Sequence, residues 1–229
     1  AAAGDAEATE LVDDVVLSIA EDVVGDRRAV SGVDLREVQA AVKEAVRRSV
    51  NWATSRGVVH VAAAGNSGYD LANKTTDRGS PNDSTPVLRQ LNAQCQDIPT
   101  ELDGVVTVSS IQRFPAGTMN SRLSSFSNRG LGVIDVAAPG SSILSTIVRN
   151  NGWGLKSGTS MASPHVAGVL ALLNSTHPDY GPAQLEALLY AQADAKACGT
   201  TTAGAACVGS NEYNSYFGHG VVDALEAVQ

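Results

Sequence analysis

Hydrophobic and polar residues alternate along the chain in two patterns, and together these patterns predict an α/β fold. Short continuous apolar runs at residues 15–19 and 58–64 are typical of buried parallel strands. Between them, residues 34–52 carry apolar side chains at three- and four-residue steps, which predicts a helix that ends at Gly57. A helix followed by a buried strand and a glycine-rich loop is the repeating unit of a doubly wound sheet, in which ligands bind beyond the carboxyl ends of the strands.

A second helix, more apolar than the first, is predicted after the Gly-Thr-Ser turn at 158–160. Residues 161–173 are mostly Ala, Val and Leu, so we expect this helix to be buried on nearly all sides, in the middle of a domain. Residues 143–146 and the region of Trp153 predict a hairpin that leads into the turn. A further helix is predicted to begin at Pro182.

Length, composition and charge limit the number of domains and the kinds of partner that this protein can have. The 229 residues suffice for one domain with a large core, so we predict a single domain over 1–229, with 1–10 as a frayed or linking segment and 69–100 as a surface excursion. The first residue is not Met and no signal pattern follows, so we expect a processed or shortened chain. The net charge of -8 and the pI near 4.9 argue against nucleic-acid and anionic membrane partners. No apolar run reaches the length of about 18 residues that a membrane-spanning helix needs.

The number and spacing of the cysteines indicate whether the protein is secreted or cytosolic. There are three, an odd count. Cys198 and Cys207 flank a short loop of Gly, Thr and Ala and are placed to close a small disulfide, which leaves Cys95 alone. In a secreted protein a leftover cysteine indicates a missing partner. The alternative is that all three are thiols of a cytosolic protein.

The Gly-Thr-Ser turn has the features of a nucleophile site. Gly158 lets the backbone turn sharply, and Ser160 falls at the positive end of a helix dipole, where negative charge that develops on an attacked carbonyl is stabilised. Ser and Thr are also ordinary N-cap residues, so a capped helix without chemistry is the alternative. His165 is not the base for Ser160, because five residues along a helix place it about 140° away around the axis.

The run Gly-Thr-Ser-Met-Ala-Ser-Pro-His-Val-Ala-Gly at 158–168 resembles the nucleophile motif of the subtilisin-like serine proteases residue for residue. The resemblance implies a three-layer α/β/α fold with a mostly parallel, doubly wound sheet. It also implies that Ser160 is the nucleophile and that His165 is structural. An endopeptidase with polypeptide substrates is the expected activity, and with the leftover cysteine the resemblance implies an extracellular location.

The loop after residues 58–64 carries a second motif of this family. Ala-Ala-Ala-Gly-Asn-Ser-Gly at 62–68 resembles the motif in which an Asn side chain donates a hydrogen bond to the tetrahedral oxyanion. The resemblance implies that Asn66 is this donor and that its neighbours wall the primary specificity pocket, namely Ala63, Ala64 and Gly65. The alternative for Asn66 is a plain turn residue.

Looser matches extend the resemblance along the chain. Residues 15–19 are similar to the family strand that lines the substrate backbone, which implies a substrate-binding role for Ser18, although Ala20 stands where the family prefers Gly. Asp135 lies inside a structural strand motif of the family, so it is not taken as the triad carboxylate. Further segments similar to the family are 104–109, 124–130, 134–140 and, for the closing turn and last helix, 216–224.

The residues that would activate Ser160 are missing. A serine hydroxyl is a poor nucleophile until a base takes its proton, and that base needs an orienting carboxylate. The family supplies an Asp before Thr/Ser-Gly and a His inside His-Gly-Thr-His, and neither motif occurs in this sequence. We therefore expect the C-terminal portion of a subtilisin-like catalytic domain, inactive by itself. The His and Asp are expected from an upstream segment, on a companion chain held non-covalently or through Cys95.

Two hypotheses of different classes follow. The first is a serine endopeptidase that acts through an acyl-enzyme on Ser160. The second is a catalytically inactive peptide-binding module, or a truncated pseudoprotease-like domain, which adds an extended peptide as a strand without cutting it. An esterase is disfavoured because the Gly-x-Ser-x-Gly elbow is absent. Calcium is common in the family and stays open for this chain, but the loops of its strong sites lie upstream, so we name no cofactor and no metal ligands from this sequence.

Overall fold

The computed structural model describes residues 35–79, 85–92, 94–148, 152–198 and 206–229, without the side chains of 35–39. The chain divides into two compact units, Ala1–Ser49 and Val50–Gln229, and each is described by itself. The predicted strand at 15–19, with Ser18, and the predicted linking segment 1–10 lie outside the described residues.

Helix α2 (Leu35–Thr54) begins in the first unit and ends in the second. It confirms the helix predicted at 34–52. Gly57 adopts the left-handed region with a φ of 89°, and the N–H of Val58 donates to Ala53 O at 3.2 Å, which closes the helix end. On the helix surface, Glu44 accepts hydrogen bonds from Arg47 and Arg48, as expected for a solvated face.

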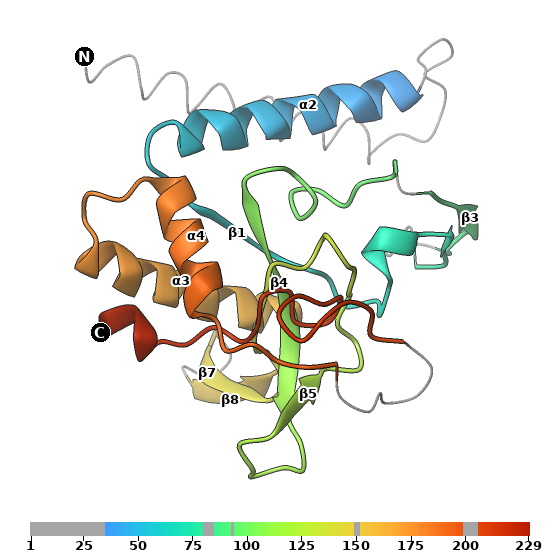
Figure 1. The fold of residues 1–229 in the computed structure, drawn as a ribbon. Coiled ribbons are helices and arrows are strands. Elements are labelled where there is room, and N and C mark those ends of the chain that lie inside the picture. Colours follow the sequence, from blue (N-terminus) through green and yellow to red (C-terminus); the bar gives the residue numbers. More distant parts are fainter. Residues whose placement is uncertain (1–34, 80–84, 93, 149–151, 199–205) are drawn as a thin grey trace. The chain divides into compact units, whose positions relative to one another are not determined.

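The second unit is built on a sheet whose middle strand is β4 (Val105–Arg113). Parallel partners are β1 (His60–Ala63) and β6 (Val136–Pro139), and β5 (Ser121–Leu123) pairs antiparallel with the end of β4. Figure 1 shows β1 and β4 beside the helices α3 (Thr159–Thr176) and α4 (Pro182–Gln192). The predicted α/β fold with a largely parallel sheet is confirmed.

Alternate residues of the strands face different layers. On the side of α3, Val106, Val108 and Val136 form one buried core with Val166 and Leu173 of the helix. On the other side, Ile111 and Ala137 pack against Tyr216 and Phe217 of the C-terminal segment. The buried hydroxyls on this sheet find partners; Ser109, for example, donates to Tyr216 O at 2.6 Å.

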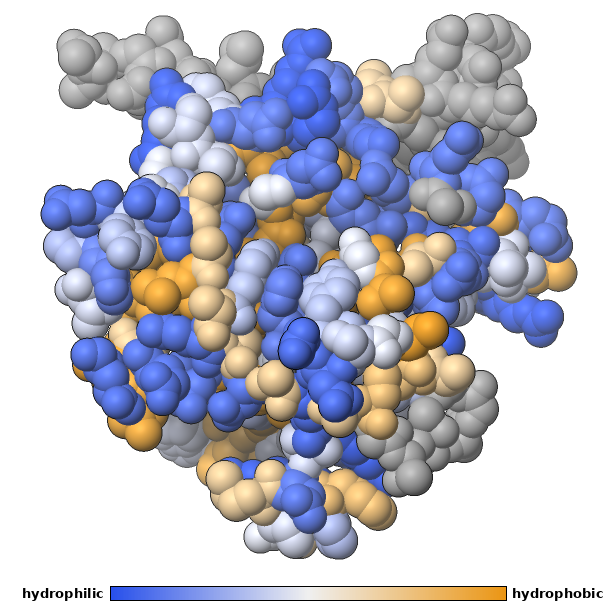
Figure 2. All heavy atoms as spheres, in the orientation of Figure 1, coloured by the Kyte–Doolittle hydropathy of each residue, from blue (hydrophilic) through white to orange (hydrophobic). Residues whose placement is uncertain are grey.

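Helix α3 differs from its prediction, because it is buried on one side only. Ala162, Val166 and Leu173 are fully buried, whereas Ala167 and Ala171 are exposed. In the view of Figure 2, hydrophobic surface comes to the outside over α3 and α4. The sequence correctly marks the whole helix as apolar, but within the described residues only one side of it is covered, by the sheet and by α4.

Shorter elements complete the second unit. The predicted hairpin is present as β7 (Ile143–Ile147) and β8 (Gly152–Lys156). The excursion at 69–100 holds the single turn η1 (Leu71–Asn73) and the two-residue pair β2 (Thr76–Asp77) and β3 (Arg89–Gln90). The predicted last helix is only one 3₁₀ turn, η3 (Glu226–Val228).

The cysteines are arranged as the spacing predicts. Cys198 and Cys207 form a disulfide with their Cα atoms 5.5 Å apart, and Cys95 is free and exposed. Among the described residues, no helix combines the length and the apolar character that crossing a membrane requires.

Candidate active site

Ser160 lies in the first turn of α3 with its side chain exposed. The turn before it is held against the loop after β6, where the N–H of Gly158 donates to Gly140 O at 2.8 Å. This approach requires a glycine, because a Cβ on Gly140 would stand 2.7 Å from Gly158 O and 2.9 Å from the Cβ of Ser110. The end of β6 therefore positions the nucleophile candidate.

Asn66 follows β1 and contacts the same turn. Its carboxamide oxygen accepts hydrogen bonds from the backbone N–H of Thr159 at 2.8 Å and from the Thr159 hydroxyl at 3.0 Å. The Thr159 hydroxyl also accepts from the N–H of Gly65 at 3.1 Å. Two motifs that are 94 residues apart in sequence are thus joined directly before Ser160.

The Asn66 amide group is free to act on a ligand. Its oxygen is occupied by Thr159, and among the described residues no acceptor is hydrogen-bonded to its Nδ2. The N–H groups in the first turn of any helix lack an intrahelical acceptor, and that of Ser160 is one of them. The side chain of Asn66 is exposed, so this donor is accessible from solvent.

Asn128 is a residue whose role sequence reasoning missed. Its buried side chain donates to Ala64 O at 2.7 Å and accepts from the N–H groups of Ser67 at 3.1 Å and Tyr69 at 2.9 Å. A Cβ on Gly65, which has a φ of 97°, would clash with Asn128 Nδ2 at 2.5 Å. Asn128 therefore shapes the loop that carries Asn66. The only sequence signal was the family-like segment 124–130.

Ala63, Ala64 and Gly65 form the end of β1 and the step to Asn66. Ala64 is fully buried, and the carbonyl of Ala63 accepts from the Thr100 hydroxyl at 3.0 Å. Backbone bonds hold this segment on two sides, because Ala64 N–H donates to Val108 O at 3.0 Å and Gly65 O accepts from the N–H of Asn128 at 2.9 Å. Of the three residues, Gly65 contacts the Ser160 turn directly, through its N–H bond to the Thr159 hydroxyl, while Ser18 lies outside the described residues.

None of the four histidines lies beside Ser160. His60 begins β1, at the end of the strand away from Asn66, and His177 caps the far end of α3, about 26 Å from Ser160. His219 stacks on Tyr190 with ring centroids 4.8 Å apart. The Nδ1 of His165 contacts Met161 O at 2.8 Å, on a different side of the helix from Ser160.

Asp135 occupies a structural position, as its motif predicts. It precedes β6, at the end of the sheet away from Ser160, and its Oδ2 accepts from Thr107 N–H at 2.7 Å. Burial raises the pKa of Asp135 from its ordinary value to about 6, and this outweighs the opposing effect of the Thr107 hydrogen bond.

Within the described ranges, no group of three or more His, Cys, Asp or Glu side chains is placed to hold a metal ion. Whether the protein binds calcium is not tested by this observation, and the sequence-based expectation stays a prediction.

Residues 18–220 match the model of the Subtilase family. The chain is 39% identical over 130 residues to a thermophilic serine proteinase of Bacillus sp. (strain AK1), covering 57% of this chain and 24% of the relative. It is 39% identical over 153 residues to an extracellular protease of Xanthomonas campestris pv. campestris, covering 63% and 21%. The chain thus spans about a quarter or less of the length of these relatives.

Solved structures are similar over most of the described fold. The epidermin leader peptide processing serine protease of Staphylococcus aureus matches with a TM-score of 0.57 and 25% identity, covering 82% of this chain and 44% of that chain. Fervidolysin of Fervidobacterium pennivorans, described as a keratinolytic enzyme related to subtilisin, matches with a TM-score of 0.55 and 28% identity, covering 82% and 24%. Because the match to the family model takes in most of this chain, residues 18–220, the chain belongs to the subtilase family.

Proposed function

We propose that this chain is the nucleophile-bearing portion of a serine endopeptidase that cleaves peptide bonds through an acyl-enzyme on Ser160. The observation that carries the proposal is the bond between Asn66 Oδ1 and Thr159 N–H at 2.8 Å. It fixes an exposed carboxamide donor next to an exposed serine at the N-terminus of α3. An oxyanion that forms on a carbonyl attacked by Ser160 would lie between these donors.

The proposed reaction has two halves. The Oγ of Ser160 adds to the carbonyl carbon of the substrate while its proton passes to a general base. The oxyanion receives hydrogen bonds from the N–H of Ser160 and from Nδ2 of Asn66. The C–N bond then breaks, the protonated base returns the proton to the leaving amine, and an acyl ester remains on Ser160. Water attacks the ester in the second half, so an acid product leaves and the serine hydroxyl is restored.

The general base comes from outside the residues of this chain, since its four histidines all lie elsewhere. We propose that a segment carrying the His and its orienting carboxylate covers the exposed side of α3. Ser160, Ala167 and Ala171 lie on one face of that helix, because seven and eleven residues correspond to nearly whole turns. Both alanines are exposed, and their small side chains allow a close approach. The segment is either upstream in the same polypeptide or on a companion chain.

The second candidate is a peptide-binding module without catalysis. It is favoured by the same placement of the histidines, none of which is within reach of Ser160. In this case the loop at Asn66 would hold an extended peptide and the serine would stay unactivated. The two candidates differ in whether a His-bearing segment accompanies the chain.

Substrates and location follow from the relatives. One solved relative is described as processing a leader peptide, and one curated relative is named an extracellular protease. These names support a polypeptide substrate and an extracellular location for this protein.

The test is labelling of the natively purified protein with a fluorophosphonate probe, followed by peptide mass spectrometry and intact masses. Adduct on Ser160, abolished in Ser160→Ala, together with a mass that accounts for a His- and Asp-bearing segment, is the expected result. If the serine stays unlabelled while such a segment is present, the endopeptidase proposal fails. If it stays unlabelled and no such segment is found, the binding module replaces it.

A further inference from the structure

The carboxylate of Asp97 lies beside Gly65, the residue before Asn66. Its Oδ2 is 3.8 Å from the point where a Cβ on Gly65 would stand. The loop of Asp97 is anchored to the same strand end, because the hydroxyl of Thr100 donates to Ala63 O at 3.0 Å. Asp97 is exposed, so the negative charge faces solvent next to the predicted wall of the specificity pocket.

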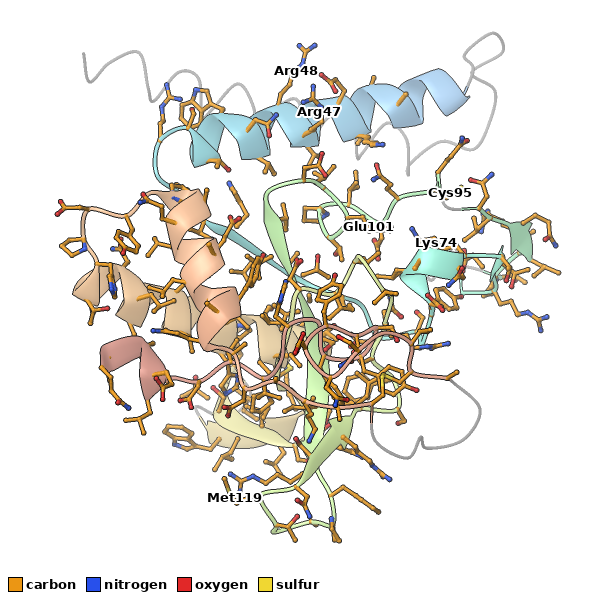
Figure 3. The ribbon with its side chains drawn as sticks, viewed as in Figure 1. Arg47, Arg48, Lys74, Cys95, Glu101 and Met119 are labelled. Atoms are coloured by element: carbon orange, nitrogen blue, oxygen red, sulfur yellow. A yellow bond between two sulfur atoms is a disulfide. The ribbon has the colours of Figure 1, made fainter. Side chains whose placement is uncertain are left out.

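Lys74, the cation whose charge acts on Asp97, is already engaged in other contacts. Lys74 forms an ion pair with Glu101 in which the two side chains are only 6% and 9% exposed, and its Nζ also donates to Cys95 O at 2.7 Å. Figure 3 shows Lys74, Glu101 and Cys95 in one region of the chain. Glu101 in turn accepts from the backbone N–H of Asp97 at 2.6 Å. The Lys74–Glu101 pair is neutral as a unit, which leaves the Asp97 charge uncompensated.

The Asp97 side chain itself has no partner in the described part of the chain: no hydrogen bond or ion pair there reaches its carboxylate. Partial burial and the negative charge of Glu101 raise the pKa of Asp97, and the positive charge of Lys74 only partly opposes them. A carboxylate in this state is stabilised by any cation that approaches it. Gly65 itself places no side chain beside Asp97, and the neighbour on that side is the neutral carboxamide of Asn128, whose Nδ2 lies 2.5 Å from the point where a Cβ on Gly65 would stand.

A substrate brings a side chain to this place. In the proposed reaction the attacked carbonyl lies between Ser160 Oγ and Asn66 Nδ2, and the Cα on its amino side is one bond away. The side chain of that residue is therefore close to the segment that immediately precedes Asn66, which is Gly65. Arg and Lys carry a charge at the end of a long stem, and Arg matches a carboxylate with two parallel donors.

We propose that Asp97 is a specificity-determining residue that selects substrates with Arg or Lys on the amino side of the scissile bond. This inference rests on the proposed endopeptidase function. An apolar residue at the same place would desolvate the Asp97 carboxylate without a partner, which disfavours it. We expect kcat/KM for an Arg substrate to exceed that for a matched Leu substrate by about 100-fold.

The experiment uses the natively purified full protein and fluorogenic peptides that differ only in the residue before the scissile bond, with Arg, Lys, Leu or Phe. Four proteins are compared: wild type, Asp97→Asn, Asp103→Asn and Asp97→Glu. Asp103 is an exposed carboxylate of the same loop, so its variant removes an equal charge a short distance away. A third variant, Asp97→Glu, keeps the charge in case the neutral variant folds poorly.

The expected result is a loss of about 10- to 100-fold in kcat/KM of Asp97→Asn for Arg and Lys substrates, with Leu and Phe substrates unchanged or improved. Asp103→Asn and Asp97→Glu should keep the preference for cationic residues. Equal losses for all four substrates, or a wild type that prefers Leu or Phe, overturn the inference.

Labelling of Ser160 by the fluorophosphonate is measured beside the kinetics. Labelled wild type without a preference for cationic residues refutes the role of Asp97 alone. Absence of labelling refutes the endopeptidase proposal and, with it, this inference.

Discussion

The carboxamide oxygen of Asn66 accepts a hydrogen bond from the backbone N–H of Thr159 at 2.8 Å, so the end of β1 and the start of α3 are fixed to each other. The bond has two consequences. It holds the Asn66 side chain in one orientation in which Nδ2 has no acceptor among the described residues, and it satisfies one of the N–H groups that a helix N-terminus leaves open. The orientation of a candidate oxyanion donor thus depends on a residue directly before the candidate nucleophile.

Substitution of Asn66 separates these two consequences. Asn66→Asp keeps an oxygen for Thr159 but removes the N–H donor, whereas Asn66→Ala removes both. We expect kcat to fall by about 100- to 1,000-fold in either variant with little change in KM, because the donor acts mainly on the transition state. Peptide hydrolysis with active-site titration measures this. Full activity of Asn66→Asp would show that the side chain only anchors the turn.

Gly140→Ala tests the close approach of the loop after β6 to the nucleophile turn. The new Cβ would meet Gly158 O at 2.7 Å and the Cβ of Ser110 at 2.9 Å, so backbone has to move. We expect the free energy of unfolding to fall by about 2 kcal/mol or more in urea denaturation. Gly168→Ala is the matched control: its Cβ meets nothing within 4 Å on an exposed helix position, so stability should be unchanged or rise by up to about 1 kcal/mol. Equal effects of the two substitutions would contradict the packing argument.

Asn128→Ala tests the residue that shapes the loop of Asn66. The substitution removes one donor and two acceptor contacts and leaves Ala64 O and two N–H groups without their partner. We expect a loss of about 3 kcal/mol in the free energy of unfolding, with weaker fluorophosphonate labelling of Ser160 in the protein that remains folded. Ser121→Ala, a partly buried position on β5, serves as a control for small polar deletions. Unchanged stability of Asn128→Ala would mean that backbone bonds alone hold the loop.

The raised pKa of Asp135 predicts that the free energy of unfolding depends on pH. Burial raises its pKa from the ordinary 3.8 to about 6. Between these values the folded protein keeps a proton that the unfolded chain has released. The contribution of Asp135 to stability is therefore full below about pH 4 and is lost as the pH rises through 6, by at most about 3 kcal/mol.

Asp135→Asn removes the charge and keeps an oxygen for the N–H of Thr107. We expect the variant to gain stability relative to wild type as the pH is raised from 4 to 7. Urea denaturation at several pH values measures this difference. A difference that stays constant over this range would refute the assignment to Asp135.

Local patterns of the chain predicted most of its elements. The helix ending near Gly57, the strand before Asn66, the hairpin before Ser160 and the helix from Pro182 all lie close to their predicted places. These predictions succeed because side-chain periodicity, glycine and proline act over a few residues. The disulfide of Cys198 and Cys207 is also a prediction from local sequence, since only nine positions separate the two cysteines.

Other features depend on contacts between distant segments, and only the tertiary structure decides them. The single buried side of α3 is one: an apolar helix has the same sequence whether one side or all sides are covered. The clamp of Asn128 on the Gly65 loop and the Asp97 charge beside Gly65 are two more. Sequence alone determined which residue types could act as nucleophile and donor, because their motifs are local. The structure decided which groups lie beside them, because hydrogen bonds and packing join residues that the chain itself keeps tens of positions apart.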